Sequence, residues 1–249
     1  MSYDVNDTTS LSRLYHLNSE PWVNENPVPN APFLQMTKSY ANAARIALPE
    51  TPLGTVDALA RARKSQRAFV DEPMTLETFA ALLRTAYAAE DPATDKSSRL
   101  LRRPVPSAGG LYPLEVYALV RSVAGIPAGV YHYDAVGDDL AVLSTDPWQD
   151  EAAKAFLTWE FVAHAPVVIC LGADFARTQT KYGARGYRFV LFEAGHVTQN
   201  ICLSAQEQGL ASLCLGGFYD GVLNRMFGLD GQAEAIPHKS ERHKRKALQ

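Results

Sequence analysis

The feature that most constrains the fold is a long helical pattern that runs from about Gly186 to Gly209. Apolar residues recur in it at steps of three and four, which places their side chains on one face of an α-helix. They are Val190, Ala194, Val197, Ile201 and Ala205. Gly209 is a natural stop, because glycine readily adopts the left-handed conformation in which many helices end. We therefore expect one long helix over this range.

Other apolar segments predict a sheet. The stretches 115–121 and 129–133 are rich in Val and Tyr and are bounded by Pro and Gly, as is typical of strands. The continuous apolar run 166–172 indicates a central strand covered on both faces. The run 210–217 also predicts a strand, followed by a short helix around 221–227. Because strands and helices interleave without a repeat, we expect a single α+β domain built on a mostly covered sheet.

The first third of the chain predicts two helices behind an arm. Residues 1–50 are poor in periodic pattern and rich in Asn and Pro, and we expect an extended arm with little regular structure. The pattern becomes helical from Val56, and a second helix follows Pro73 with Thr75 as its N-cap. The apolar stripe of this second helix is Leu76, Phe79, Leu82 and Leu83. Residues 91–100 have the composition of a loop, and the domain itself is expected over 51–236.

Composition excludes some classes of protein. Of the 249 residues, 47% are hydrophobic and 20% charged, as in ordinary globular domains. No apolar run approaches the roughly 20 residues of a membrane-spanning helix, and the opening MSYDVNDTTS does not have the pattern of a signal peptide. We expect a cytoplasmic protein that binds neither membrane nor nucleic acid. The basic tail 237–249 could contact an acidic partner, but a solvated tail is the simpler interpretation.

The sequence offers little support for a metal site. Its three cysteines, Cys170, Cys202 and Cys214, lie in apolar surroundings without a Cys-x-x-Cys pair, and we expect buried reduced thiols. Glu193-x-x-His196 is half of a di-iron motif, but no second E-x-x-H exists, so both residues are expected to be structural. The phosphate-loop, dinucleotide-binding and nucleophile-elbow motifs are also absent from the sequence.

Four clusters carry chemistry, although each is weak by itself. Arg63, Ser65 and Arg67 place two guanidinium groups and a hydroxyl at a helix end, a set that can hold a phosphate. The small-residue segments 106–113 and 215–218 would let backbone approach a flat ligand closely. Lys181-Tyr182 could form a proton-transfer pair. A solvated basic helix end, plain turns and a surface lysine beside a packing tyrosine are the alternatives.

Together and in this order, the clusters resemble the SagB-type dehydrogenases of the nitroreductase superfamily. The matching segments are R-x-S-x-R-x-F, PSAGGLYPLEVY, GVYHYD, EAGHVTQNICLSAQEQGL and LGGFYD, within roughly residues 55–235. The opening SLSRLYHLNSEPW is also similar to a segment that often precedes the domain in that family.

The resemblance implies a nitroreductase-like fold, with a mixed central sheet flanked by helices, and a homodimer with FMN bound at the subunit interface. Arg63 and Ser65 would hold the phosphate, and Arg67 would face the pyrimidine side of the flavin. The segment that reaches the flavin from the other subunit would be Pro106, Ser107, Ala108 and Gly109, and the loop facing the flavin N5 would contain Gly216 and Gly217. Lys181 and Tyr182 match the catalytic pair of the azoline-oxidising branch.

The implied reaction is the oxidation of a thiazoline or oxazoline ring to a thiazole or oxazole in a peptide natural-product pathway. The substrate would be a ribosomal peptide or a carrier-bound intermediate, and a cyclodehydratase or a carrier protein would be a partner. Two alternatives stay open: a generic NAD(P)H-dependent nitro or quinone reductase, and a flavin-poor scaffold in a biosynthetic complex. The segment after Glu234-Ala235 departs from the family, because it lacks the expected apolar strand.

Overall fold

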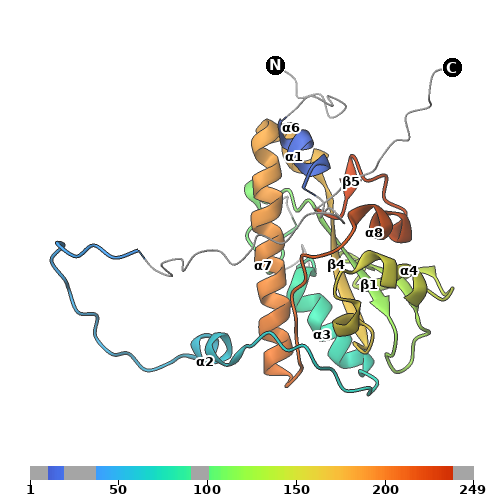
Figure 1. The fold of residues 1–249 in the computed structure, drawn as a ribbon, viewed down its shortest axis with the longest axis horizontal. Coiled ribbons are helices and arrows are strands. Elements are labelled where there is room, and N and C mark those ends of the chain that lie inside the picture. Colours follow the sequence, from blue (N-terminus) through green and yellow to red (C-terminus); the bar gives the residue numbers. More distant parts are fainter. Residues whose placement is uncertain (1–10, 20–37, 91–100, 238–249) are drawn as a thin grey trace.

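A five-stranded antiparallel sheet forms the centre of the fold (Figure 1). The computed structural model describes residues 11–19, 38–90 and 101–237. The strands lie in the order β3-β2-β1-β4-β5. Their bounds are β1 (Leu114–Val120), β2 (Gly129–Asp134), β3 (Asp139–Ser144), β4 (Val167–Asp174) and β5 (Glu234–Ala235). Parallel pairing among the described residues is limited to isolated bridges, Ser65 with Ser212 and Met74 with Val123.

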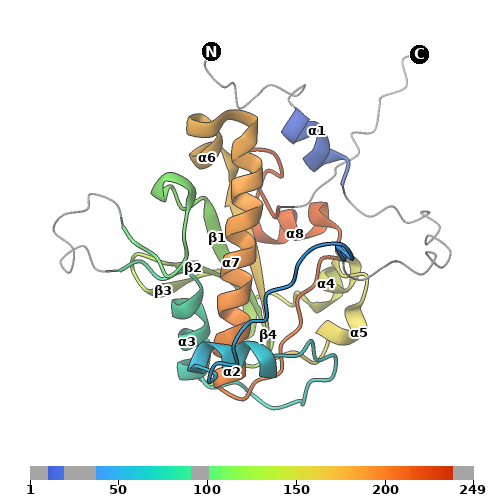
Figure 2. The same cartoon turned by 90° about the vertical axis from the view of Figure 1, so that its left-hand side faces the viewer.

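Helices cover both faces of this sheet. The α-helices are α1 (Leu11–Leu17), α2 (Thr55–Ala62), α3 (Leu76–Tyr87), α4 (Gln149–Ala155), α5 (Trp159–Val162), α6 (Phe175–Tyr182), α7 (Gly186–Glu207) and α8 (Asp220–Phe227). Two short 3₁₀ turns, η1 (Ala108–Gly110) and η2 (Gly183–Arg185), precede β1 and α7. Helices α3 and α7 lie on one side of the sheet, and α4 and α8 lie on the other (Figures 1 and 2).

Strand β1 shows why the fold has three layers. Successive side chains of a strand point to opposite faces, and here Val116 and Ala118 join the core under α3 and α7. Tyr117 and Leu119 join a second core, which includes residues of α4 and α8. Cys170 of β4 belongs to this second core, whereas Ile169 packs against the first one. The predicted central strand at 166–172 is therefore covered on both faces.

The two helices that pack on the first face agree with their sequence patterns. In α7, Val190 and Val197 are fully buried, and the chain leaves the helix at Gly209 with φ of 71°. In α3, Thr75 caps the N-terminus by accepting a 3.2 Å hydrogen bond from the backbone N–H of Thr78. Leu76 is the exception in the predicted stripe, because its side chain is exposed.

The first 50 residues contain more regular structure than expected. Residues 11–17 form α1, which docks on the domain through His16, whose Nδ1 lies 3.2 Å from Tyr187 Oη. The ring of His16 also contacts Phe175 edge-on, so burial of this aromatic side chain stabilises the helix against the body. Residues 44–54 have no regular structure. Helix α2, which follows them, buries none of its residues.

The predicted strand at 210–217 is wrong. This segment is extended but lies outside the sheet, and only Ser212 forms an isolated bridge. Its bridge at Ser212 joins it to Ser65, which follows α2, and not to a strand of the sheet. The sheet instead gains two strands that were not predicted, β3 through a hairpin with β2 and the short β5. The predicted loop 91–100 and most of the basic tail lie outside the described residues.

Candidate functional site

Gly109 lies against Lys181 and Tyr182, although more than 70 residues separate it from this pair in the sequence. Gly109 lies in η1 with φ of 66°, a conformation that favours glycine. A Cβ atom built on it would lie 2.8 Å from Lys181 Nζ and 2.8 Å from Tyr182 Oη. The absence of a side chain at Gly109 therefore lets the ammonium and the phenol approach the backbone of the small-residue turn.

The Lys-Tyr pair occupies the last turn of α6. Asp174 caps this helix, because its carboxylate accepts a 3.0 Å hydrogen bond from Ala176 N. The ring of Tyr182 packs edge-on against Phe189 of α7, with 5.0 Å between ring centroids. Lys181 Nζ lies 5.4 Å from the centroid of the Tyr182 ring. Lys181 is exposed and Tyr182 half-buried, so the pair faces the surface and is accessible to a substrate.

Buried hydrogen bonds hold the 106–110 turn in place. Ser107 Oγ accepts a 2.9 Å hydrogen bond from Tyr112 N, and Ser107 also hydrogen-bonds to the buried carboxyl of Glu193. Burial raises the pKa of Glu193, against the lowering effect of its hydrogen bonds with Ser107 and Tyr87. Glu193 thus has the structural role expected for it. Within the described segments, no group of three His, Cys, Asp or Glu residues is placed to hold a metal ion.

Arg177 links several elements through its side chain, and the sequence pattern did not predict this role. Its Nη2 lies 2.6 Å from Glu115 Oε1, and its Nε lies 3.1 Å from Asp174 Oδ2. Its Nη1 donates to the carbonyl of Tyr112 at 3.3 Å. Arg177 therefore ties the segment after η1 to β1 and α6. No local pattern marks this residue, because its partners come from different elements.

A second group forms around Arg63 at the end of α2. Arg63 Nη1 donates to Ser65 Oγ at 3.5 Å. Ser65 bridges to Ser212, and Gln66 N donates to Ser212 O at 3.0 Å, so residues 63–67 pair with the segment that leads to Gly216. Ser65 and Arg67 are exposed. Gly216 has open space where its side chain would be, whereas Gly217 accepts a hydrogen bond from Leu157 N.

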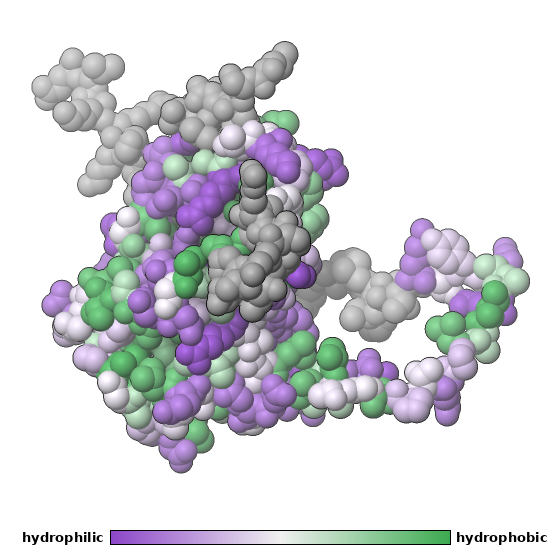
Figure 3. Space-filling model, turned by 180° about the vertical axis from the view of Figure 1, so that it is seen from behind, coloured by the Kyte–Doolittle hydropathy of each residue, from purple (hydrophilic) through white to green (hydrophobic). Residues whose placement is uncertain are grey.

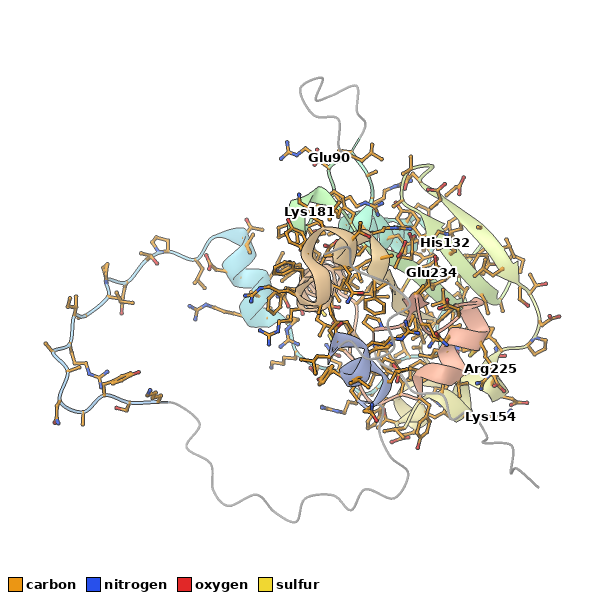
Figure 4. The ribbon with its side chains drawn as sticks, turned by 90° about the horizontal axis from the view of Figure 1, so that it is seen from above. Glu90, His132, Lys154, Lys181, Arg225 and Glu234 are labelled. Atoms are coloured by element: carbon orange, nitrogen blue, oxygen red, sulfur yellow. The ribbon has the colours of Figure 1, made fainter. Side chains whose placement is uncertain are left out.

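The structure thus brings the expected site residues into two groups. Lys181 and Tyr182 precede the N-terminus of α7, whereas Ser212 follows its C-terminus, and α7 has 22 residues. At 1.5 Å per residue, such a helix is about 33 Å long. Figure 2 shows α6 and α2 at opposite ends of α7. From above, Lys181 lies away from Lys154 and from Arg225 of α8 (Figure 4). One chain does not place both groups around one small ligand.

Comparison with known protein families identifies the fold. Residues 60–236 match the model of the nitroreductase family. The chain belongs to the nitroreductase family. This match confirms the resemblance to the nitroreductase superfamily and the nitroreductase-like fold expected from the sequence motifs. The protein is therefore an oxidoreductase of a flavin-binding family. In the described segments, no helix is both long and apolar enough to cross a membrane.

Individual relatives differ in how much of their length the chain spans. A nitroreductase of Methanocaldococcus jannaschii is 37% identical over 66% of this chain and 79% of its own length. The microcin B17-processing protein of Escherichia coli is 30% identical over 65% of this chain and 59% of its own. The trifolitoxin-processing protein of Rhizobium leguminosarum is 27% identical over 72% and 51%. The chain therefore spans just over half of each peptide-processing relative.

Solved structures support the same assignment. The E. coli microcin synthetase complex with truncated pro-microcin B17 bound matches with a TM-score of 0.62 and 25% identity, over 86% of this chain and 80% of the other. A nitroreductase from Ralstonia eutropha matches with a TM-score of 0.60 over 80% of this chain and 89% of the other. At 22% identity, that second match shows the fold alone.

Proposed function

We propose that the protein is an FMN-dependent dehydrogenase that oxidises thiazoline or oxazoline rings of a peptide to thiazoles or oxazoles. The observation that carries the proposal is the meeting of Lys181 Nζ and Tyr182 Oη over Gly109. This proton-transfer pair lies in a chain that is similar to two peptide-processing proteins of the nitroreductase family. Loss of hydride from an azoline must be accompanied by loss of a proton, and the pair supplies an acceptor.

The residues around Arg63 fit the phosphate of FMN. A guanidinium and a hydroxyl side by side, as Arg63 and Ser65 are, form the charge-assisted donor set that phosphate prefers. Arg67 is exposed next to them and would face the pyrimidine side of the ring. Gly216 leaves open space at its backbone, which suits a flat ring, and Gly217 would lie beside it. Bound FMN would supply the two-electron acceptor that the reaction needs.

The residues of the chain would perform the rest of the reaction. Lys181 and Tyr182 would hold the proton that leaves a ring carbon. Gly109 would keep both groups close to the backbone of the turn. Pro106, Ser107 and Ala108 would present that turn to the ligand, held by the buried Glu193. Fixing these groups before the substrate binds reduces the cost of orienting them.

A second copy of the chain would complete the site. The two groups of residues lie at opposite ends of α7, and a homodimer could bring the Arg63 group of one subunit to the Lys181 group of its partner. The arm and α2 expose large apolar side chains that a partner would cover, among them Ile46 at 90% and Leu48 at 88% exposure. Figure 3 shows hydrophobic residues along the arm that projects from the body. Sedimentation should give twice the 27.3 kDa of one chain, and a flavin-loaded monomer would contradict this arrangement.

The proposed substrate is a peptide that carries an azoline ring. The solved relative holds a truncated pro-microcin peptide within a complex, and a cyclodehydratase or a carrier protein would be the corresponding partner here. The decisive experiment incubates the purified, FMN-loaded protein with an azoline peptide and measures its mass. Loss of two hydrogens per ring supports the function, whereas an unchanged peptide mass with fully loaded protein contradicts it.

A generic nitro or quinone reductase is the second candidate, because the M. jannaschii relative is named as a nitroreductase. This activity requires NAD(P)H as the electron donor. Rapid NAD(P)H oxidation with a nitroaromatic or quinone acceptor, together with no azoline oxidation, would favour it. The Lys181-Tyr182 pair has no role in that reaction, so substitution of either residue should leave the NAD(P)H rate unchanged.

A further inference from the structure

Cys202 and Cys214 form a close thiol pair. Their Sγ atoms are 3.5 Å apart and come from different segments, Cys202 from α7 and Cys214 from the extended stretch after it. Cys202 is buried and Cys214 is exposed. The expectation of buried thiols is therefore wrong for Cys214, because the 210–217 segment lies at the surface instead of in the sheet. A reagent from solvent can reach this pair.

The surroundings make the two thiols unequal. The hydrogen bond from Cys214 lowers the pKa of Cys202, and Ser212 and the positive charge of Arg63 act in the same direction, against its burial. The pKa of Cys214 is raised by its hydrogen bond with Cys202, by burial and by the negative charge of Cys202. Of the two thiols, Cys202 has the additional hydrogen bond with Ser212, which favours Cys202 as the thiolate and Cys214 as the neutral partner. The third cysteine differs, because burial raises the pKa of Cys170 to about 12.

We propose that Cys202 and Cys214 are a redox modification site that forms a reversible disulfide when a hydroperoxide reaches it. The Cys202 thiolate attacks a peroxide oxygen and the O–O bond breaks, giving a sulfenic acid at Cys202 and, after protonation, water or an alcohol. The Cys214 sulfur then attacks the Cys202 sulfur, and water leaves with the Cys214 proton. Two thiols are oxidised and one peroxide is reduced. A small dithiol restores both thiols by exchange.

The geometry allows this bond with modest movement. The sulfur atoms must approach from 3.5 Å to about 2.05 Å. Cys214 belongs to the segment whose Ser212 pairs with Ser65, so the disulfide would tie that segment to α7. Neither cysteine has a part in the proposed ring oxidation. A test of the disulfide can therefore fail or succeed whatever the result for the ring oxidation.

The test uses the whole chain and counts thiols, without any turnover. The reduced protein is treated with hydrogen peroxide, denatured, alkylated with iodoacetamide and weighed. We expect one alkylated cysteine, Cys170, a loss of two hydrogens, and recovery of all three thiols after dithiothreitol. Peptide mapping should join the peptides that contain Cys202 and Cys214. Three alkylated cysteines after peroxide, or a bond that joins two copies of the chain, would overturn the proposal.

Variants identify the two roles. Cys214→Ser should stop at the sulfenic acid, which dimedone traps at Cys202. Cys202→Ser should give at least a tenfold slower dimedone reaction at Cys214. Cys170→Ser is the matched control, and its disulfide should form at the wild-type rate. Dimedone capture at Cys170, or equal capture at Cys202 and Cys214 in the single variants, would contradict the assignment. The wild-type thiol count decides the proposal even if one variant does not fold.

Discussion

Tyr87 Oη donates a 2.6 Å hydrogen bond to Glu193 Oε1 and accepts one of 3.1 Å from the backbone N–H of Leu114. The phenol thereby joins α3, α7 and the start of β1 inside the core, where Tyr87 is fully buried. Burial raises its pKa, and the negative charge of Glu193 adds to this effect, so the phenol stays protonated and keeps donating. The same carboxyl group holds Ser107, and through it the turn that contains Gly109.

We predict that Tyr87→Phe destabilises the protein by about 1–3 kcal/mol, because a buried carboxyl and a buried N–H each lose a partner. Urea unfolding followed by circular dichroism measures this change. Tyr40→Phe is the control, because Tyr40 is exposed and its substitution should stay within about 0.5 kcal/mol. Equal stability of both variants would mean that the buried network does not stabilise the fold.

A second prediction concerns Gly109. Gly109→Ala should slow azoline oxidation by at least about tenfold, because the new methyl group would displace the Lys181 and Tyr182 end groups and a misplaced catalytic group is costly. Gly125→Ala is a matched control, because Gly125 has φ of 86° and nothing within 4 Å of its Cβ position. Both variants carry the strain of a positive φ, but only one disturbs the pair. Peptide mass spectrometry over time gives the two rates.

The third prediction is a pH dependence from Glu115. Burial alone would raise the pKa of Glu115, but the hydrogen bond from His132 and the charge of Arg177 outweigh it and lower that pKa. A carboxyl whose pKa is lower in the folded chain stabilises the fold above its unfolded pKa, about 4.3, and loses this contribution as pH falls through the folded value. The stability difference between wild type and Glu115→Gln should therefore be full at pH 5 and shrink below about pH 4.3.

Thermal unfolding of wild type and variant between pH 5 and pH 3 measures this difference. Glu151→Gln is the control, because the Glu151–Lys154 ion pair has side chains that are 40% and 68% exposed. Exposed pairs contribute little, so that difference should be much smaller than the Glu115 difference at pH 5. If the stability difference between wild type and Glu115→Gln instead grows as the pH falls, the pKa of Glu115 is not lowered in the folded chain.

The fourth prediction tests the proposed phosphate site. Arg63→Ala removes a charge-assisted hydrogen bond of about 1.5–3 kcal/mol, which corresponds to roughly 10- to 150-fold weaker FMN binding. Titration of apoprotein with FMN, followed by flavin fluorescence, gives the affinity. Arg61→Ala is the control, because Arg61 lies on the exposed last turn of the same helix. If both variants bind FMN as tightly as wild type does, Arg63 is not a phosphate ligand.

The parts of the fold that depend on local pattern were predictable. The period of α7, the cap at Thr75 and the apolar run of β4 each follow from neighbouring residues in the sequence. The run 210–217 has the same apolar character as a strand, but its bridge at Ser212 joins Ser65 and not a strand of the sheet. Composition at 210–217 contains no information about which distant segment it pairs with.

The residues of the proposed site were selected from the sequence, whereas their arrangement in space was not predicted. Lys181 and Tyr182 were selected through a family resemblance, and nothing local to them indicates that Gly109 lies against them. Arg177 and its partners Glu115 and Asp174 come from β1, β4 and α6, so the ion pairs exist only once the sheet has formed. The closeness of Cys202 to Cys214 likewise follows from the turn that closes α7 at Gly209.

The last prediction separates proton transfer from cofactor binding. Lys181→Ala and Tyr182→Phe should each slow azoline oxidation by about 10²–10⁴-fold, the usual contribution of a general acid–base group. Flavin content should not change, because neither side chain belongs to the group around Arg63. Lys154→Ala is the control, because Lys154 is also an exposed lysine but lies beside α8 on another part of the surface (Figure 4).

The double variant makes this prediction sharper. If Lys181 and Tyr182 transfer the proton as one unit, loss of either group disables that unit, and the double variant should be little slower than each single one. Independent roles would instead multiply the two effects. Rates are measured as loss of two hydrogens from the peptide, with flavin absorbance recorded on the same samples. Wild-type rates in both single variants would leave the nitroreductase family intact but remove the Lys181-Tyr182 pair from catalysis, and with it the reason for proposing azoline oxidation.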